Sequence, residues 1–211
     1  MASLASHGPS IPSLPTTPIL TLARTLIRPY HPSDTAASAR QANDPEIARW
    51  MRNTFPHPYE LQHAESFINT IALATKSASP LRPEGILLNY AICRSSDGAF
   101  VGGIGLKPFS DVEARTVELG YWLGREHWGR GYAGEAVAAF TAWAFATFPD
   151  LLRVEACVYE GNPASEAVLR RAGFQFEGLR RKAIWKNGQS LGMRNYGLLK
   201  DECPGLEGVI I

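Results

Sequence analysis

Three glycines stand immediately before a long apolar run, and their placement constrains the fold more than any other feature of the chain. Gly129, Gly131 and Gly134 lie in the segment REHWGRGYAGEA, which leads into AVAAFTAWAFATF. Backbone N–H groups at the start of a helix point outward, the helix dipole adds positive potential there, and glycines let a phosphate come close. The segment therefore predicts an anion-binding turn that opens a helix, although three glycines also suit a tight turn that only packs a helix against a strand.

The same glycines match the GxGxxG spacing of a dinucleotide-binding turn. That fingerprint places its first glycine directly after the first strand of a parallel sheet, with an acid closing the next strand. Here Gly124 to Trp128 separate the glycines from the preceding strand-like segment, and although Glu160 closes the next strand, no further alternating strand–helix units follow. A nucleotide-binding oxidoreductase module is therefore the less favoured alternative.

Charge and cysteine usage exclude several classes of partner. The 21 basic and 20 acidic residues are well mixed and give a formal net charge of +1, so no overall field would hold a nucleic acid. Cys93, Cys157 and Cys203 are odd in number and far apart, which argues against a disulfide framework or a zinc site and favours a reducing, cytoplasmic compartment. No apolar run approaches the roughly 18 residues that a membrane span needs, and no metal motif is present, so we expect neither membrane nor metal.

The chain reads as one folded domain between two ends. Residues 1–20 are rich in proline and serine, carry no basic residue, and have every apolar run interrupted by proline, so we expect a flexible segment rather than a signal or transit peptide. We predict the folded domain at 21–200 and a C-terminal tail at 201–211.

The predicted elements follow an order typical of a mixed α/β (α+β) fold. The chain begins with a group of helices, continues with an antiparallel meander of strands, and ends with a strand–helix–strand–helix–hairpin segment. The strands are expected at 24–30, 86–94, 99–108, 115–124 and 153–159, with a final hairpin turning at Asn187-Gly188. The helices are expected from Ser33 or Asp34 to about 42, after Asn43 or Asp44, from Tyr59, from the glycines to about 148, and from Asn162 to Gly173.

Two segments carry a resemblance to a known family. ELGYWLGREHWGRGYAGEAV, followed about thirty residues later by NPASEAVLRRAGFQFEG, resembles the core of the GNAT superfamily of N-acetyltransferases. More narrowly, it resembles the RimJ/RimL-type branch, the ribosomal-protein N-terminal acetyltransferases and their relatives, from about Arg24 to Lys200. The resemblance implies the GNAT fold, a mixed and mostly antiparallel sheet with a central strand splay, flanked by helices. It also implies acetyl-CoA as the cofactor and CoA as the product.

The resemblance assigns the glycines to the diphosphate of acetyl-CoA. The family's diphosphate loop falls on Glu126 to Ala133, and the pantetheine arm would lie between the splayed strands VELGYWL and RVEACVY. A backbone N–H near Tyr121 to Leu123 would face the acetyl carbonyl, where negative charge develops. The expected cofactor-binding residues are Tyr121, Trp122, Leu123, Gly129, Arg130, Gly131, Tyr132, Ala133, Gly134, Asn162 and Ser165.

Amine acetylation needs a neutral amine and a proton for the departing thiolate. Many relatives supply that proton from a tyrosine seven residues after the motif's asparagine, where this chain has Leu169; the RimL-type alternative is a serine three residues after it, which is Ser165. Glu118 is the expected base, directly or through water, and a solvent-facing strand residue is its alternative role. Both substrates bind together in this chemistry, so Cys157 is expected to pack in its strand rather than act as a nucleophile.

The acceptor pocket is expected between the early helices and the final hairpin. Its aromatic walls suit a small amine or a short N-terminal peptide. The expected acceptor-binding residues are Phe55, His57, Tyr59, Glu118, Trp185 and Tyr196. Some RimL-type enzymes carry an acid where this chain has Ile184, which slightly favours a small-molecule amine over a protein N-terminus. We expect a monomer or homodimer, and a catalytically silent acyl-CoA sensor is the remaining alternative.

Overall fold

The computed structural model describes residues 16–75, 81 and 85–206. Fifteen residues of the expected N-terminal segment, the last five of the expected tail, and residues 76–80 and 82–84 lie outside these ranges. The strand β1 begins at Leu20, within the segment that we expected to be flexible.

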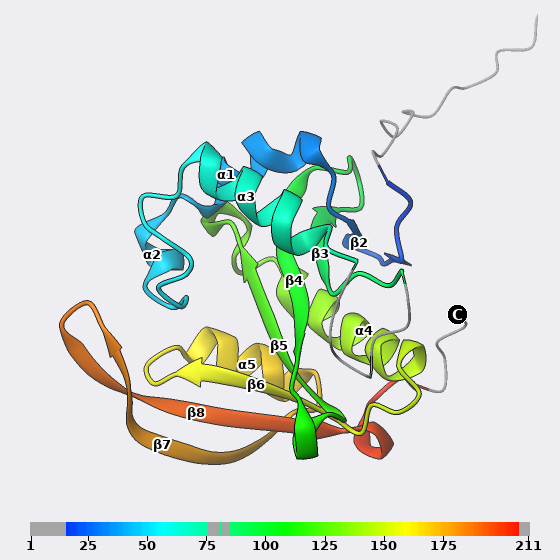
Figure 1. Ribbon diagram of the computed structural model, residues 1–211, viewed down its shortest axis with the longest axis vertical. Helices are drawn as coiled ribbons and strands as arrows, with labels where there is room; N and C mark the ends of the chain where they lie inside the picture. Colours follow the sequence, from blue (N-terminus) through cyan, green and yellow to red (C-terminus); the bar gives the residue numbers. More distant parts are fainter. Residues whose placement is uncertain (1–15, 76–80, 82–84, 207–211) are drawn as a thin grey trace, which may run out of the picture.

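One mixed sheet of eight strands organises the molecule, in the order β1-β2-β3-β4-β5-β6-β8-β7 (Figure 1). Every neighbouring pair is antiparallel except β5 and β6, which are parallel. The strands are β1 Leu20–Thr21, β2 Thr25–Pro29, β3 Asn89–Arg94, β4 Phe100–Pro108, β5 Thr116–Leu123, β6 Arg153–Tyr159, β7 Gln175–Lys186 and β8 Gln189–Leu199. The expected mixed, mostly antiparallel sheet is confirmed.

The parallel pair opens into a splay. β5 and β6 pair only from Thr116 to Glu118 on one strand and from Arg153 to Glu155 on the other. Beyond these residues the two strands diverge, and Figure 1 shows β5 leaving β6 at an angle. At the end of β5, the backbone groups on the side away from β4 therefore have no neighbouring strand to pair with.

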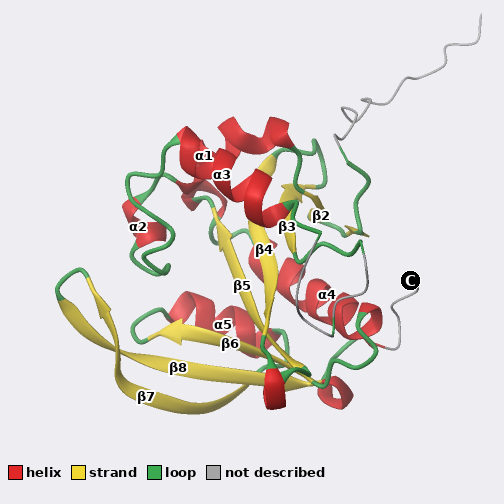
Figure 2. Ribbon diagram, in the orientation of Figure 1, coloured by secondary structure: helices red, strands yellow, loops and turns green. Residues whose placement is uncertain are grey.

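Helices cover both faces of the sheet (Figure 2). Side chains that alternate along β2 point to opposite faces of the sheet. Ile27 packs in the core that includes α4 and α5, whereas Leu26 packs in the core that includes the π-turn after α3. The helices are α1 Thr35–Ala42, α2 Pro45–Ala48, α3 Leu61–Phe67 with its π-turn Ile68–Ala72, α4 Tyr132–Thr147 and α5 Pro163–Arg171; the short 3₁₀ turns are Pro32–Asp34, Asp111–Glu113, Arg125–His127 and Lys200–Glu202.

Asp34 does not cap the first helix by its side chain, contrary to one of the two expected caps. Its carboxylate instead accepts two hydrogen bonds from the Arg28 guanidinium, at 2.7 and 2.8 Å, in a site where both side chains are almost fully buried. His31 caps the 3₁₀ turn that precedes α1. A buried arginine without a charged partner destabilises a fold more than the loss of one helix cap does.

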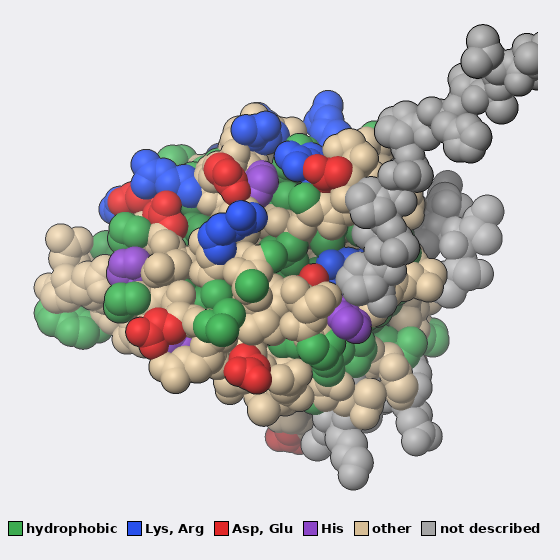
Figure 3. All heavy atoms as spheres, turned by 90° about the horizontal axis from the view of Figure 1, so that it is seen from above, with side chains coloured by type: hydrophobic (Ala, Val, Ile, Leu, Met, Phe, Trp, Pro, Cys, Tyr) green, Lys and Arg blue, Asp and Glu red, His purple; other side chains and the backbone are tan. Residues whose placement is uncertain are grey.

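The surface view in Figure 3 shows basic and acidic side chains interspersed on the face it presents, without a continuous basic tract. Over the described ranges, no helix is both long and apolar enough to cross a bilayer. Within the same ranges, no group of three or more His, Cys, Asp or Glu side chains is arranged to hold a metal ion.

Candidate active site

The glycine loop forms an open cradle at the start of α4. Gly129 and Gly131 have φ of 73° and 79°, in the left-handed region that L side chains rarely adopt, and Gly131 is the N-cap residue immediately before α4. A Cβ built on Gly129 or on Gly134 would meet no described atom within 4 Å, so the space beside these residues is open. The first turn of α4 can therefore be reached by an anionic group, as the sequence predicts.

Other loop residues hold the shape of this cradle. Trp128 donates from its indole nitrogen to the Leu123 carbonyl at 2.9 Å, and Arg130 donates from Nε to the Glu126 carbonyl at 3.1 Å. The side chains of Tyr132 and Ala133 pack against the core on the α4 face. Both side chains are only partly buried, and the Tyr132 ring lies 6.3 Å from the His127 ring in the turn that precedes the glycines, measured between centroids.

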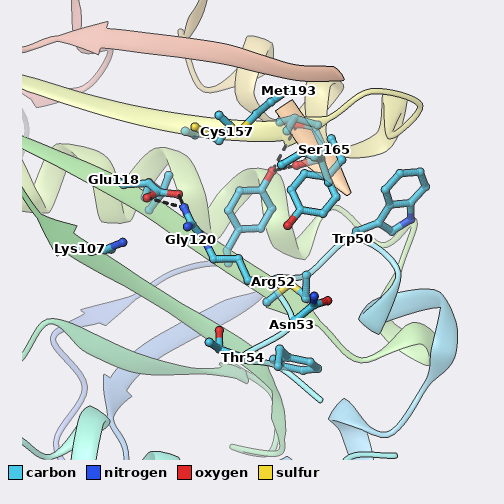
Figure 4. Close-up of a pocket in the computed structure, with 18 of the residues that line it drawn as sticks. Trp50, Arg52, Asn53, Thr54, Lys107, Glu118, Gly120, Cys157, Ser165 and Met193 are labelled. Carbon is cyan, nitrogen blue, oxygen red and sulfur yellow. Dashed lines mark hydrogen bonds and ion pairs between the residues drawn. The ribbon is translucent and has the colours of Figure 1, made fainter. Parts of the chain in front are cut away.

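A cavity of about 930 Å³ occupies the splay and extends toward the loop between α2 and α3. Such a volume is in the range of a ligand pocket. Its walls come from the ends of β5 and β6, the start of α5, β8, and residues 50–56 of that loop; the polar and reactive side chains among them include Arg52, Glu118, Tyr121, Cys157, Asn162 and Ser165. Figure 4 shows Glu118, Cys157, Ser165 and Met193 around this space.

Ser165 lies in the first turn of α5, where the helix cap fixes it. The Asn162 side chain accepts a hydrogen bond from the Ser165 backbone N–H at 3.2 Å. The Ser165 Oγ is hydrogen-bonded to the Tyr121 hydroxyl at 2.7 Å. Burial raises the pKa of Tyr121 to about 12, so this phenol stays protonated at neutral pH. Only the Tyr121 backbone was expected to take part, because the two residues are 44 positions apart and no local pattern joins their side chains.

Glu118 faces the cavity and is held by an arginine that the sequence did not single out. Both of its carboxylate oxygens accept from Arg52 Nη2, at 2.6 and 2.9 Å, and Figure 4 shows the two side chains pointing at each other. The Glu118 side chain is 16% exposed, so its alternative as a solvent-facing strand residue does not fit this structure. The hydrogen bond that Arg52 donates to Glu118 is the main cause of the raised pKa of Arg52. Lys107 lies opposite Glu118 in the register of β4 and β5.

A smaller cavity of about 240 Å³ adjoins the first and has aromatic walls. The Phe55 ring lies 4.7 Å from Tyr59 and 5.6 Å from Trp122, measured between centroids. A Cβ on Gly103 would collide with the Tyr30 hydroxyl and the Trp122 indole nitrogen. The glycines of β4 therefore give these rings room to lie across the strand. Phe55 and Tyr59, expected at the acceptor pocket, line both cavities, whereas Trp122, expected beside the cofactor, lines only the smaller one.

Three expected acceptor residues lie outside both cavities. Tyr196 is fully buried on the other face of β8, where its hydroxyl donates to Glu166 at 2.7 Å. Trp185 is 71% exposed near the hairpin turn, although its neighbour Ile184 lines the larger cavity. His57 is exposed in the loop and lines neither cavity. The sequence places each of these residues on a strand or in a loop, but it does not show which side of that element faces the pocket.

The hairpin reaches this site through Lys186. Its ammonium donates to the Met51 carbonyl at 2.8 Å and to the Asn53 side-chain oxygen at 3.0 Å. Met51 and Asn53 belong to the loop that walls the larger cavity. The end of β7 is thus fastened to that wall.

Cys157 lines the cavity but is not activated. Its thiol lies 3.8 Å from the Asn195 side-chain oxygen, and burial, with the nearby Glu118 charge, raises its pKa to about 11. A nucleophilic cysteine needs a lowered pKa. The expected packing role is therefore consistent with its surroundings.

Comparison with known proteins gives a single family. The model of the acetyltransferase (GNAT) domain family matches residues 24–175. The uncharacterized N-acetyltransferase p20 of Bacillus licheniformis is 30% identical over 183 residues, covering 86% of this chain and 96% of its own. The putative ribosomal N-acetyltransferase YdaF of Bacillus subtilis is 37% identical over 109 residues, 52% of this chain and 58% of its own. The structure of Mycobacterium smegmatis RimJ in complex with CoA-disulfide has a TM-score of 0.68 and 28% identity, covering 85% of this chain and 84% of that one.

Proposed function

This chain belongs to the GNAT acetyltransferase family, which uses acetyl-CoA, and on that premise we propose that it acetylates a primary amine by direct attack in a ternary complex. The glycine cradle fits the diphosphate of acetyl-CoA, because its first-turn N–H groups stand beside open space and side chains larger than hydrogen at Gly129 and Gly134 would project into it. Acetyl-CoA supplies the acetyl group as a thioester, whose sulfur leaves as a thiolate.

One observation carries the proposal: a carboxylate and a hydroxyl pair line the same cavity in the splay. Glu118 is the group that takes the proton from the amine, and Ser165, hydrogen-bonded to Tyr121, holds the proton that a thiolate needs. Glu118 already accepts from Arg52, yet a carboxylate offers about four lone-pair directions and keeps room for an ammonium. The two hydrogen bonds from Arg52 hold this carboxylate in one position, where it lines the cavity.

A small-molecule amine is the acceptor that the pocket favours. The aromatic cavity beside Glu118 is small, and the loop that walls the larger cavity is fastened by Lys186. An apolar amine fits such walls. A protein N-terminus is the second candidate, which the name of the relative YdaF supports.

A thermal-shift panel followed by an amine screen tests the proposal. We expect acetyl-CoA and CoA to raise the unfolding midpoint and NAD, NADP and ATP to leave it unchanged, and Gly131→Phe to abolish the shift. The screen then measures CoA release with small amines and with short N-terminal peptides. Release with small amines supports the favoured acceptor, and release with peptides alone supports the second. Midpoint shifts without turnover on any amine would contradict an enzyme and indicate a sensor.

A further inference from the structure

A cation from the start of the chain lies beside the glycine loop. A Cβ built on Gly131 would stand 2.6 Å from Nη1 of Arg24, so the guanidinium occupies the space next to the N-cap residue of α4. Arg24 belongs to the turn between β1 and β2, far from the loop in sequence. Neither the glycine pattern nor the splay draws attention to this residue.

The backbone of Arg24 is held in place from two sides. Its N–H donates to both carboxylate oxygens of Glu135, at 3.1 Å each, and the neighbouring Thr25 hydroxyl donates to the same carboxylate at 2.6 Å. On the other side, Ser95 donates from its N–H to the Arg24 carbonyl at 3.0 Å. Glu135 lies in the first turn of α4, so the helix that carries the loop also fixes the arginine beside it.

The charge of Arg24 is left available. Its side chain is exposed, and among the described residues it forms no ion pair within 4.0 Å. Glu135, the acid beside it, is engaged by the backbone N–H and the Thr25 hydroxyl. A guanidinium with free donors is suited to bidentate recognition of a phosphate. Arg130, the arginine expected at the loop, donates a hydrogen bond from its Nε to the Glu126 carbonyl.

We propose that Arg24 binds a phosphate group of the coenzyme A moiety and that Glu135 is its positioning residue. This proposal rests on the binding of coenzyme A, and it does not depend on which amine is the acceptor or which residue is the base. The phosphate belongs either to the diphosphate, which the backbone N–H groups of the loop also contact, or to the 3′-phosphate of the ribose. Both carry the chemistry that an arginine recognises, and dephospho-CoA, which lacks the 3′-phosphate, separates them.

Calorimetric titration with CoA and with dephospho-CoA tests the proposal without any acceptor. We expect Arg24→Gln to weaken CoA binding roughly tenfold or more, and Arg24→Lys to restore part of the affinity. Glu135→Gln should weaken it less, because the arginine is displaced rather than removed. Arg115→Gln is the matched control, since Arg115 is 61% exposed at the opposite end of β5. Equal losses for both ligands assign Arg24 to the diphosphate, and a loss confined to CoA assigns it to the 3′-phosphate.

Salt dependence separates binding from a merely structural role. A guanidinium–phosphate contact is screened by ions, so the difference between the native protein and Arg24→Gln should shrink between about 0.05 M and about 0.5 M salt. The unfolding midpoint of the ligand-free variant reports whether the fold is intact. A folded Arg24→Gln variant that binds CoA with native affinity at low salt would overturn the proposal. So would a loss of affinity that does not respond to salt and is not restored by lysine.

Discussion

The hydroxyl of Ser165 is the residue-scale feature on which the proposed chemistry depends. Removing it should leave the helix cap intact, because Asn162 accepts from the Ser165 backbone rather than from its side chain. We expect Ser165→Ala to lower kcat on the order of 10²-fold, the lower end of what general acid catalysis contributes, with little change in the KM for acetyl-CoA. Tyr121→Phe should lower kcat less, because the serine hydroxyl is still present.

Steady-state release of the CoA thiol measures both variants. Ser110→Ala is the matched control, since Ser110 is exposed and its side chain makes no cap hydrogen bond. A Ser165→Ala enzyme with native kcat would assign the proton to another group and reduce Ser165 to a helix residue.

At the same scale, the family resemblance pointed to Ser165 and Glu118 but not to their partners. Asn162 and Ser165 are three positions apart on one helix turn, so a motif records them. Arg52 meets Glu118 across 66 positions, and no periodicity in the sequence connects a loop to a strand over that separation. The side on which a residue faces is equally hidden, which is why Tyr196 and Trp185 were expected at the pocket. Partnerships of this kind are decided by packing of whole elements.

At the scale of elements, the order of the helices and strands could be predicted from hydrophobic periodicity and from the glycine, proline and asparagine residues that end or begin them. β6 and α5 are found where alternation and the Asn162-Pro163 start predict them, and the hairpin turns at Asn187-Gly188, both with positive φ. The splay could not be derived from periodicity, because both strands keep their alternation while they diverge; it came from the family resemblance. The aromatic cavity depends on the glycines of β4, because a side chain there would collide with the rings that lie across the strand. The sequence does not show which rings lie there, so this cavity could not be predicted from it.

The contact between the hairpin and the cavity wall predicts a specificity change. Lys186→Met removes both hydrogen bonds to Met51 and Asn53, which frees the loop at residues 50–56 to move away from the hairpin. We expect kcat/KM for N-terminal peptides to rise relative to that for a small amine, by a few fold. Parallel assays with the two acceptor classes measure the ratio. Lys200→Met is the control, because Lys200 bonds to Pro149, away from the cavity. An unchanged ratio would show that the fastening does not limit acceptor size.

The buried pair of Arg28 and Asp34 joins β2 to the turn that starts α1, and its removal should destabilise the fold. Asp34→Asn leaves an arginine that is 2% exposed without a countercharge, so we expect the free energy of unfolding to fall by about 3 kcal/mol. Urea unfolding followed by circular dichroism measures the loss. Arg28→Met combined with Asp34→Leu should be more stable than Asp34→Asn alone, because no charge is then buried. A single variant as stable as the native protein would contradict this account.

Across the whole molecule, several acidic groups are buried in their neutral form. Burial raises the pKa of Cys93 from 9.0 to about 12 and that of Tyr121 from 10.0 to about 12, and it raises the pKa of Tyr30 still further. In the unfolded chain these groups ionise near their ordinary values. Between about pH 9 and pH 12 the folded state therefore binds more protons than the unfolded state, and stability falls as the pH rises.

This linkage predicts alkaline unfolding that burial of Cys93 helps to drive. The stabilisation from each group is complete below its ordinary pKa and is lost progressively toward pH 12, so the free energy of unfolding should be flat near pH 8 and decline above about pH 9. Cys93 alone should contribute on the order of 1 kcal/mol to the loss by pH 10. Because Cys93→Ala removes one titrating group from a fully buried site, its decline should be shallower than that of the native protein, whatever its stability at pH 8. Urea midpoints measured from pH 8 to pH 11 test both slopes. Parallel slopes would mean that the buried thiol does not control the alkaline limit, and a flat native profile would mean that none of these groups does.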